Sequence, residues 1–301
     1  RGLGDVYKRQ IYAYGKISFT SGVVSYLAKH GVTIHFFNKY GFYEGSFYPR
    51  ETLVSGDLLV RQVEHYLENE KRLYLAREFV RGAVNNILKN LQYYERTKGE
   101  FEEEIETIKS FLDKLEEQTE VSQIMAIEGN VRDIYYQSFN KIFPEEFRFD
   151  KRTKRPPENM INSLISFGNS LVYSTVLTEI YNTQLNPTIS YLHEPFERRF
   201  SLALDLSEVF KPLLSDRVIF KLVNKNMVDK NCFVRDLEGI ILNERGRRVF
   251  LENYHEKLST TIKHRELRRK VSFQRLVRLE CYKLVKHLLG IKKYRAFVIW
   301  W

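Results

Sequence analysis

Two patterns of hydrophobic positions divide the chain. Up to about residue 50, apolar residues occur in short alternating runs, and after Gly56 they recur with the spacing of helices. The first pattern predicts a helix at Ser21–Lys29 and strands at Ile11–Tyr14, Val32–Phe37 and Phe42–Tyr48. We therefore expect an α+β multidomain protein, with a small β domain at 1–54, a linker from Pro49 to Gly56, and a large, mostly α-helical catalytic domain at 58–301.

The helical pattern predicts most of the second domain. Asn243 is expected to cap a helix that runs to His264, because its short polar side chain precedes an apolar spacing of 3.6. A small hairpin is expected from Cys232–Arg235 and Gly239–Leu242. The other expected helices are Leu58–Tyr94 with a break near Asn69, Glu100–Leu115, Ser122–Phe139, Glu158–Tyr181, Phe200–Phe220 and Phe273–Leu289.

The β domain has few strands for a free-standing fold. Arg1–Gln10 lacks a Met and does not resemble a natural start, so we exclude it as an artefact and expect a truncated N-terminus. Val32–Phe37 and Phe42–Tyr48 should pair as a hairpin that has lost flanking strands. An apolar edge carrying Ile34, Phe36 and Phe37 would then face solvent or another chain, which puts dimerisation through this domain in doubt.

Composition is ordinary for a soluble globular protein, with 43% hydrophobic and 29% charged residues. No apolar run approaches the roughly 18 residues of a membrane helix. The two cysteines, Cys232 and Cys281, form neither a disulfide framework nor a metal cluster. We expect a cytoplasmic protein with no membrane partner.

Charge is concentrated at one end of the chain. The net charge is +10, residues 243–301 carry +11, and the remainder sums to −1. A basic cluster at 263–270, which includes Arg268, Arg269 and Lys270, suits a polyanion such as double-stranded DNA. The alternative is a solvated helix face.

Paired carboxylates are the strongest physical signal. Asp205 and Glu208 lie three residues apart, on one face of a helix whose other positions are nearly all apolar. They should repel each other unless a cation lies between them or protons neutralise them. This spacing therefore predicts a metal site.

Two further groups lie in apolar surroundings. Glu128 is flanked by Ile124, Val131 and Ile134 in a helix, where a lone carboxylate is costly without a cation. An i,i+4 ion pair with Arg132 is the alternative. His193 follows an apolar pair and precedes Pro195, as a loop residue held in place would. Carboxylates with one imidazole suit Mg²⁺ or Mn²⁺ in phosphoryl chemistry.

A competing metal class is the di-iron carboxylate bundle. That class needs a Glu-x-x-His motif on each of two helices. The sequence has one such tetrad, from Glu252 to His255, which disfavours this class. No phosphate-binding glycine loop, nucleophile elbow or Cys/His zinc pattern is present.

Six segments resemble one family over nearly the whole chain. In this order along the chain, they are similar to the CRISPR-associated spacer-acquisition integrase family, the universal adaptation nuclease of those systems. The segments are Leu75–Val80, Glu128–Arg132, Arg155–Gly168, Leu192–His193, Leu202–Pro212 and Leu242–Arg247.

The resemblance implies roles for individual residues. The family's metal triad falls on Glu128, His193 and Glu208, with Asp205 as a supporting carboxylate and Tyr173 near the scissile strand. Some members have Asp at the position of Glu208. Glu keeps the negative charge and places the carboxylate one methylene group further from the backbone. The positions expected near DNA phosphates are Arg132, Lys211, Arg152, Lys154 and Arg155.

The resemblance also implies an activity. Members dimerise, and two dimers grip a central dimer of a small CRISPR-associated partner protein. A 3′-hydroxyl of a captured DNA fragment then attacks a phosphodiester of the CRISPR array, with a divalent metal at the site. Two alternatives stay open, a structure-selective nuclease without a joining function and a DNA-binding subunit whose acidic site is vestigial.

Overall fold

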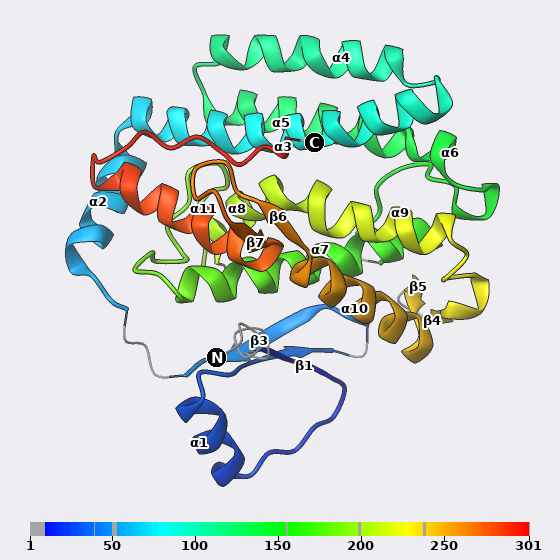
Figure 1. Cartoon of the computed structure of the whole chain (residues 1–301), viewed down its shortest axis with the longest axis horizontal. Coiled ribbons are helices and arrows are strands. Elements are labelled where there is room, and N and C mark those ends of the chain that lie inside the picture. The colour runs from blue at the N-terminus through cyan, green and yellow to red at the C-terminus, as the bar shows by residue number, and fades with distance from the viewer. Residues whose placement is uncertain are drawn as a thin grey trace. The chain divides into compact units, whose positions relative to one another are not determined.

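The computed structural model describes residues 10–38, 40–49, 53–154, 156–197, 200–236 and 239–300. The chain divides into two compact units, Arg1–Val54 and Ser55–Trp301 (Figure 1). A strand-containing first unit and a helical second unit confirm the predicted α+β class.

The described residues of the first unit form a three-stranded sheet with one helix. Strands β1 (Gln10–Tyr14) and β2 (Thr33–Phe37) are parallel, and helix α1 (Ser21–Lys29) connects them. Parallel neighbours need a crossover of this kind, because the chain must return to the same end of the sheet. Strand β3 (Tyr43–Phe47) pairs antiparallel with β2, which confirms the predicted hairpin.

The predicted apolar edge is wrong. Strand β2 is the central strand, with β1 on one side and β3 on the other. Ile34 and Phe37 are each only 1% exposed, and Phe36 is half-buried against Phe19. The sequence pattern did not reveal that Ile11–Tyr14 pairs with β2, because parallel pairing depends on how the crossover packs.

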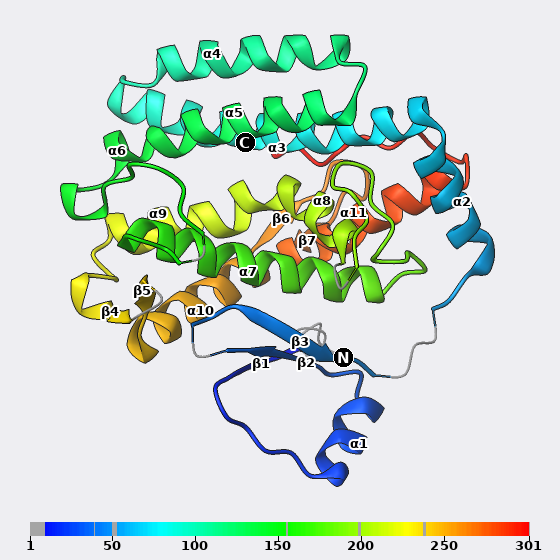
Figure 2. The ribbon, with the colours of Figure 1, turned by 180° about the vertical axis from the view of Figure 1, so that it is seen from behind.

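The second unit is built from helices (Figures 1 and 2). Its larger elements are α2 (Gly56–Leu67), α3 (Asn69–Lys98), α4 (Glu102–Asp113), α5 (Val121–Gln137), α6 (Phe139–Ile142), α7 (Met160–Tyr181), α8 (Ser201–Lys211), α9 (Arg217–Asn224), α10 (Glu244–Ser259) and α11 (Phe273–Leu288). Short 3₁₀ turns lie at Lys114–Glu117, Glu145–Phe147 and Lys230–Cys232. Two hairpins complete it, β4 (Phe233–Asp236) with β5 (Gly239–Leu242), and β6 (Thr261–Lys263) with β7 (Lys270–Ser272).

Helices α3 and α7 lie on either side of α8 and form the core around it. Helix α7 buries side chains around nearly its whole circumference, as expected for a helix surrounded by others. Gly168 allows α7 to approach the turn after α8 closely. A Cβ at this position would collide with Ser215 and Phe250, so glycine lets α7 pack directly against the turn that follows α8.

The C-terminal segment after α11 has no regular structure but is held along α3 (Figure 1). Buried Asn86 donates to the carbonyl of Phe297 (2.9 Å) and accepts from the N–H of Ile299 (2.9 Å). Buried Glu280 accepts from the hydroxyl of Tyr294 (2.7 Å) and the N–H of Phe297 (2.8 Å). These bonds replace the ones that a helix or sheet would supply.

Two predicted helices differ from the structure. The helix capped by Asn243 ends at Ser259 rather than His264, because residues 261–263 pair with β7 instead. The helix predicted at Phe200–Phe220 is interrupted by a π turn at Pro212–Asp216. Pro212 lacks the N–H that would continue the α-helical ladder, and buried Asn90 donates to its carbonyl (2.9 Å).

Within the described residues, no helix combines the length and apolar character needed to span a membrane.

Candidate active site

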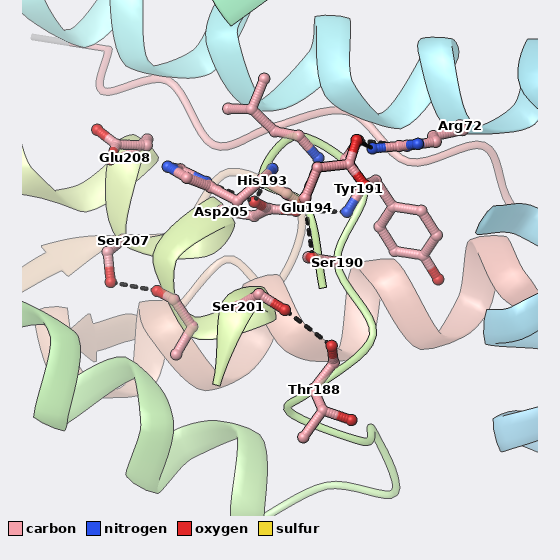
Figure 3. Close-up of polar contacts among 12 residues, drawn as sticks. Arg72, Thr188, Ser190, Tyr191, His193, Glu194, Ser201, Asp205, Ser207 and Glu208 are labelled. Carbon is pink, nitrogen blue, oxygen red and sulfur yellow. Dashed lines mark hydrogen bonds and ion pairs between the residues drawn. The ribbon is translucent and has the colours of Figure 1, made fainter. Parts of the chain in front are cut away.

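His193 lies in a loop that is organised by one buried carboxylate (Figure 3). Asp205, at the buried face of α8, accepts the backbone N–H groups of Tyr191 (2.7 Å), Leu192 (3.0 Å) and His193 (2.9 Å). Its Oδ1 also accepts from His193 Nδ1 (2.8 Å). The imidazole therefore carries its proton on Nδ1, which leaves the Nε2 lone pair free to act as a ligand or base.

Helices α2 and α3 hold the same loop from the other side. Arg72 donates to the carbonyl of Tyr191 (3.1 Å) and to the carboxylate of Glu194 (2.5 Å), and Tyr66 also donates to Glu194 (2.9 Å). Gln62, fully buried on α2, exchanges two bonds with the backbone of Asn186 (3.1 and 2.8 Å). The loop that carries His193 is thus held by hydrogen bonds before the histidine, at Asn186 and Tyr191, and after it, at Glu194.

Glu208 lies one turn after Asp205 and is almost completely buried. Its carboxylate bonds to Lys211 (2.5 Å) and to the guanidinium of Arg132. Burial alone would raise the pKa of Glu208, but Arg132, Lys211 and His193 together lower it to about 2. Glu208 is therefore an anion at neutral pH.

Glu128 approaches the same point from α5. Its side chain is 21% exposed, and its carboxylate accepts from Arg132 Nε (2.5 Å), four residues further along the helix. The local pair named as an alternative for Glu128 is thus present. Because Arg132 also bonds to Glu208, one guanidinium joins the two carboxylates across α5 and α8.

The predicted cation between Asp205 and Glu208 is not needed. The two carboxylates leave α8 in different directions, Asp205 toward the loop N–H groups and Glu208 toward Arg132. Each has its own compensating donors, which removes the repulsion that the spacing suggested.

The donor set can still be tested for its fit to a metal. Among the described residues, no three His, Cys, Asp or Glu side chains form a ready metal cluster. Glu128 and Glu208 nevertheless share one cation, and the ring of His193 extends toward Glu208 (Figure 3). Two anionic carboxylates and a free imidazole nitrogen are hard and borderline donors, which fit Mg²⁺ or Mn²⁺ if Arg132 moves aside.

The other predicted DNA contacts lie in different settings. Arg152 is engaged within the protein, donating to Asn162 (2.9 Å) and Ser166 (2.9 Å), so it is poorly placed to hold a phosphate. Lys211 is paired with Glu208, and exposed Lys154 lies in the field of Lys211 and Arg132. Arg155 lies outside the described residues.

The C-terminal basic cluster and Tyr173 lie on other elements than the ones that carry the carboxylates. Arg268, Arg269 and Lys270 are exposed at the β6–β7 hairpin, where Arg268 adopts a left-handed backbone (φ 51°). Their exposure suits either a phosphate contact or a solvated face. Tyr173 is half-buried on α7, and its role near a scissile strand stays a prediction.

Sequence reasoning missed Asp216 at the end of the π turn. Asp216 is fully buried, and neither of its oxygens reaches hydrogen-bond geometry with another group, although the Tyr135 hydroxyl approaches it. Burial raises its pKa to about 7, against the opposing effect of Arg132. The sequence did offer one signal for this residue, because an acidic side chain at 216 falls between the apolar pairs 213–214 and 218–219 of a predicted helix.

A half-buried, pre-oriented imidazole beside carboxylates in a basic chain is typical of an enzyme that acts on phosphate esters. The family model for CRISPR associated protein Cas1 matches residues 7–256. The chain therefore belongs to the Cas1 family.

Relatives with assigned names agree with this family. The chain is 57% identical over 291 residues to CRISPR-associated protein Cas1 1 of Methanobrevibacter ruminantium, covering 97% of this chain and 88% of the relative. It is 51% identical over 290 residues to CRISPR-associated endonuclease Cas1 of Fusobacterium nucleatum, covering 96% of this chain and 86% of the relative. The names of such relatives indicate an endonuclease.

Solved structures share the fold. The Cas1 protein TM1797 of Thermotoga maritima superposes with a TM-score of 0.85 at 40% identity, covering 96% of this chain and 88% of that one. A casposase bound to an integration product has a TM-score of 0.87 at 22% identity, covering 95% of this chain and 80% of that one. A Cas6-RT-Cas1–Cas2 complex has a TM-score of 0.83 at 17% identity, covering 97% of this chain and 32% of that one. The last two likenesses are of fold alone.

Proposed function

We propose that this chain is a metal-dependent DNA endonuclease and integrase of CRISPR adaptation. It would insert captured DNA fragments into a CRISPR array by attack of a 3′-hydroxyl on a phosphodiester, in antiviral defence. The observation that carries the proposal is the convergence of Glu128 and Glu208 on one cation, beside an imidazole that Asp205 orients. Relatives named endonuclease support the cutting half of the activity.

Glu128, Glu208 and His193 would hold the metal. When bound, Mg²⁺ or Mn²⁺ activates an oxygen nucleophile and neutralises charge on phosphoryl oxygens. Asp205 keeps His193 Nδ1 protonated and Nε2 directed away from the loop, so the ring needs no reorientation to serve the site. Lys211, bonded to Glu208, keeps that carboxylate ionised and places a positive charge where a phosphate would approach.

The joining half of the proposal has support from fold neighbours. The casposase structure is bound to an integration product, and the Cas6-RT-Cas1–Cas2 structure is a complex of that name. We propose by analogy that this chain acts on double-stranded DNA as a homodimer, and that two dimers bind a central dimer of a small Cas2-type partner in a hetero-hexamer. Light scattering of the chain with and without that partner tests the assembly.

A strand-transfer assay tests the activity. Radiolabelled duplex DNA with free 3′-hydroxyls is incubated with a CRISPR repeat plasmid, the partner protein, and Mn²⁺ or Mg²⁺. We expect covalent joining that requires the metal and is lost in Glu128→Gln and Glu208→Gln. Cleavage without joining would leave a plain nuclease, and binding without either reaction would indicate a vestigial site.

A matched control keeps this test specific. Glu179 is also a buried carboxylate paired with an arginine, Arg278 (2.5 Å), but it lies on α7 and is not part of the candidate site. Glu179→Gln should lower stability as the site variants do while preserving joining. Equal loss of joining in this variant would show that the assay reports folding rather than chemistry.

A further inference from the structure

Arg132 occupies the position at which the two site carboxylates meet. Its guanidinium bonds to Glu128 and to Glu208, and Nη1 also lies 3.3 Å from the hydroxyl of Tyr136. The side chain is only 16% exposed. A divalent cation held by Glu128 and Glu208 would use the same carboxylate oxygens, so the guanidinium and the metal are alternatives at that point.

A displaced Arg132 needs another anion. A guanidinium keeps its charge in proteins, and moving it to an apolar place without a partner is costly. Its aromatic neighbour Tyr136 offers a hydroxyl but no formal charge. A carboxylate within reach of the same side chain would remove most of the cost.

Asp216 has the required properties. It is fully buried, and neither of its oxygens has a hydrogen bond of good geometry, although the hydroxyl of neutral Tyr135 lies near it. Buried carboxyl groups are rarely left so, and each one calls for a physical reason. Arg132 is the leading favourable charge on Asp216, ahead of Lys211, so the two side chains already lie within electrostatic range.

The other cations that face Asp216 are bonded to other groups. Lys211 is bonded to Glu208 (2.5 Å), and Arg152 is held by Asn162 and Ser166 (2.9 Å each). Tyr135 accepts from Asn90 (2.9 Å) and directs its hydroxyl toward Asp216, but it is neutral and supplies no counter-charge. Among these groups, Arg132 is the cation whose present partners a metal would take.

We infer that Arg132 is an internal competitor of the divalent metal, and that Asp216 is the second anchor that receives its guanidinium when the metal takes Glu128 and Glu208. The inference rests on the proposed metal function. It assigns Asp216 a positioning role, acting through Arg132, and it makes the metal affinity of the site depend on a side chain that is not a ligand.

The test is a double-mutant cycle on Mn²⁺ affinity, measured from the electron paramagnetic resonance of free Mn²⁺ in the absence of DNA. Arg132→Met should tighten binding by about tenfold, because the competitor is gone. Asp216→Asn should weaken binding by about fivefold, because the displaced guanidinium has no anionic partner. The double variant should match Arg132→Met, since Asp216 acts only through Arg132.

Additive effects of the two changes would overturn the inference, as would unchanged or weaker binding in Arg132→Met. Arg132→Lys serves if Arg132→Met fails to fold. Its single ammonium cannot fork between two carboxylates, so we expect tightening of a few-fold. Arg278→Met, which removes a guanidinium from buried Glu179 outside the site, should leave Mn²⁺ affinity unchanged.

The two proposals fail in different ways. If Mn²⁺ affinity is insensitive to both Glu128→Gln and Glu208→Gln, the proposed metal site is wrong and the inference falls with it. If those variants abolish Mn²⁺ binding but the cycle is additive, the metal site stands and only the competition between Arg132 and the metal is rejected.

Discussion

Asp205 and His193 are joined twice, because Oδ1 of the carboxylate accepts both the imidazole Nδ1–H (2.8 Å) and the backbone N–H of the same histidine (2.9 Å). One oxygen atom thus sets the tautomer of the ring and the position of the backbone that carries it. The second oxygen anchors the two preceding residues, so the loop and the ring cannot be moved independently.

Asp205→Asn should therefore damage both stability and activity. The amide can accept with only one atom, and its NH₂ faces N–H donors that it cannot satisfy. We expect a loss of about 3–5 kcal/mol in the free energy of unfolding, as for the breaking of a buried charged network. Urea titration measures it. Asp229→Asn, which changes an exposed carboxylate that also accepts a backbone N–H, from Asn231 (2.9 Å), should leave the free energy of unfolding almost unchanged.

Two glycine substitutions in helices should have opposite signs. Gly168→Ala would drive a methyl group into Ser215 and Phe250, and we expect destabilisation of about 1–3 kcal/mol. Gly129→Ala on α5 meets nothing within 4 Å, so a gain of about 0.5–1 kcal/mol is expected from helix propensity. Thermal unfolding of both variants checks the pair. Equal effects would mean that α7 does not depend on this close approach.

The first unit should lose stability in acid. Burial lowers the pKa of His35 to about 3 from 6.5, so the unfolded chain binds more protons between these values. Stability is therefore complete above about pH 6.5 and falls as the pH drops below it. His35→Gln should remove this slope while retaining a bond to Ser46. Hydrogen exchange of residues 33–37 from pH 7 to pH 5 measures the effect, and an unchanged slope would contradict it.

The second unit should show the opposite trend at Asp216. Burial raises the pKa of Asp216 in the folded chain to about 7, above the ordinary value of 3.8, so the unfolded chain loses its proton first as the pH rises. The contribution of this group is complete below about pH 4 and is lost as the pH approaches 7. Asp216→Asn should be more stable than the parent chain at pH 8, by roughly a few kcal/mol, and equal to it at pH 4. Urea unfolding of the variant and the parent chain at pH 4 and pH 8 measures this difference in the free energy of unfolding.

The basic hairpin predicts a salt effect on DNA binding. Replacing Arg268, Arg269 and Lys270 together with Gln should flatten the dependence of duplex affinity on salt by about two to three units of log–log slope, if each contacts a phosphate. The control triple variant replaces Lys16, Lys29 and Lys225, which are also exposed, and so removes the same charge. Equal slopes for the two triple variants would mean that the hairpin charges form a solvated face.

Local pattern predicted most of the helices because their apolar spacing is regular. The break near Asn69, the cap at Asn243 and the pair between Glu128 and Arg132 all depend on residues close in sequence. The central position of β2 and the bonds from Asp205 to the His193 loop depend on tertiary packing instead. Asp216 was missed because its significance lies in the partners it lacks, and a sequence does not show those.

The π turn at Pro212–Asp216 has a consequence for insertions and deletions. A π turn holds one residue more than an α-helical turn, so removing Leu214 would let α8 and α9 merge into one regular helix. Because the wider π turn accommodates this extra residue, the residues after the deletion would keep their directions around the helix axis. Arg217 would then stay beside Asn90, its present partner at 2.8 Å, and the change would be confined to the turn itself. A single-codon deletion here would therefore preserve the helical content and the inward-facing side chains of α9, whereas the same deletion inside α8 would rotate every later residue of the helix by about 100°.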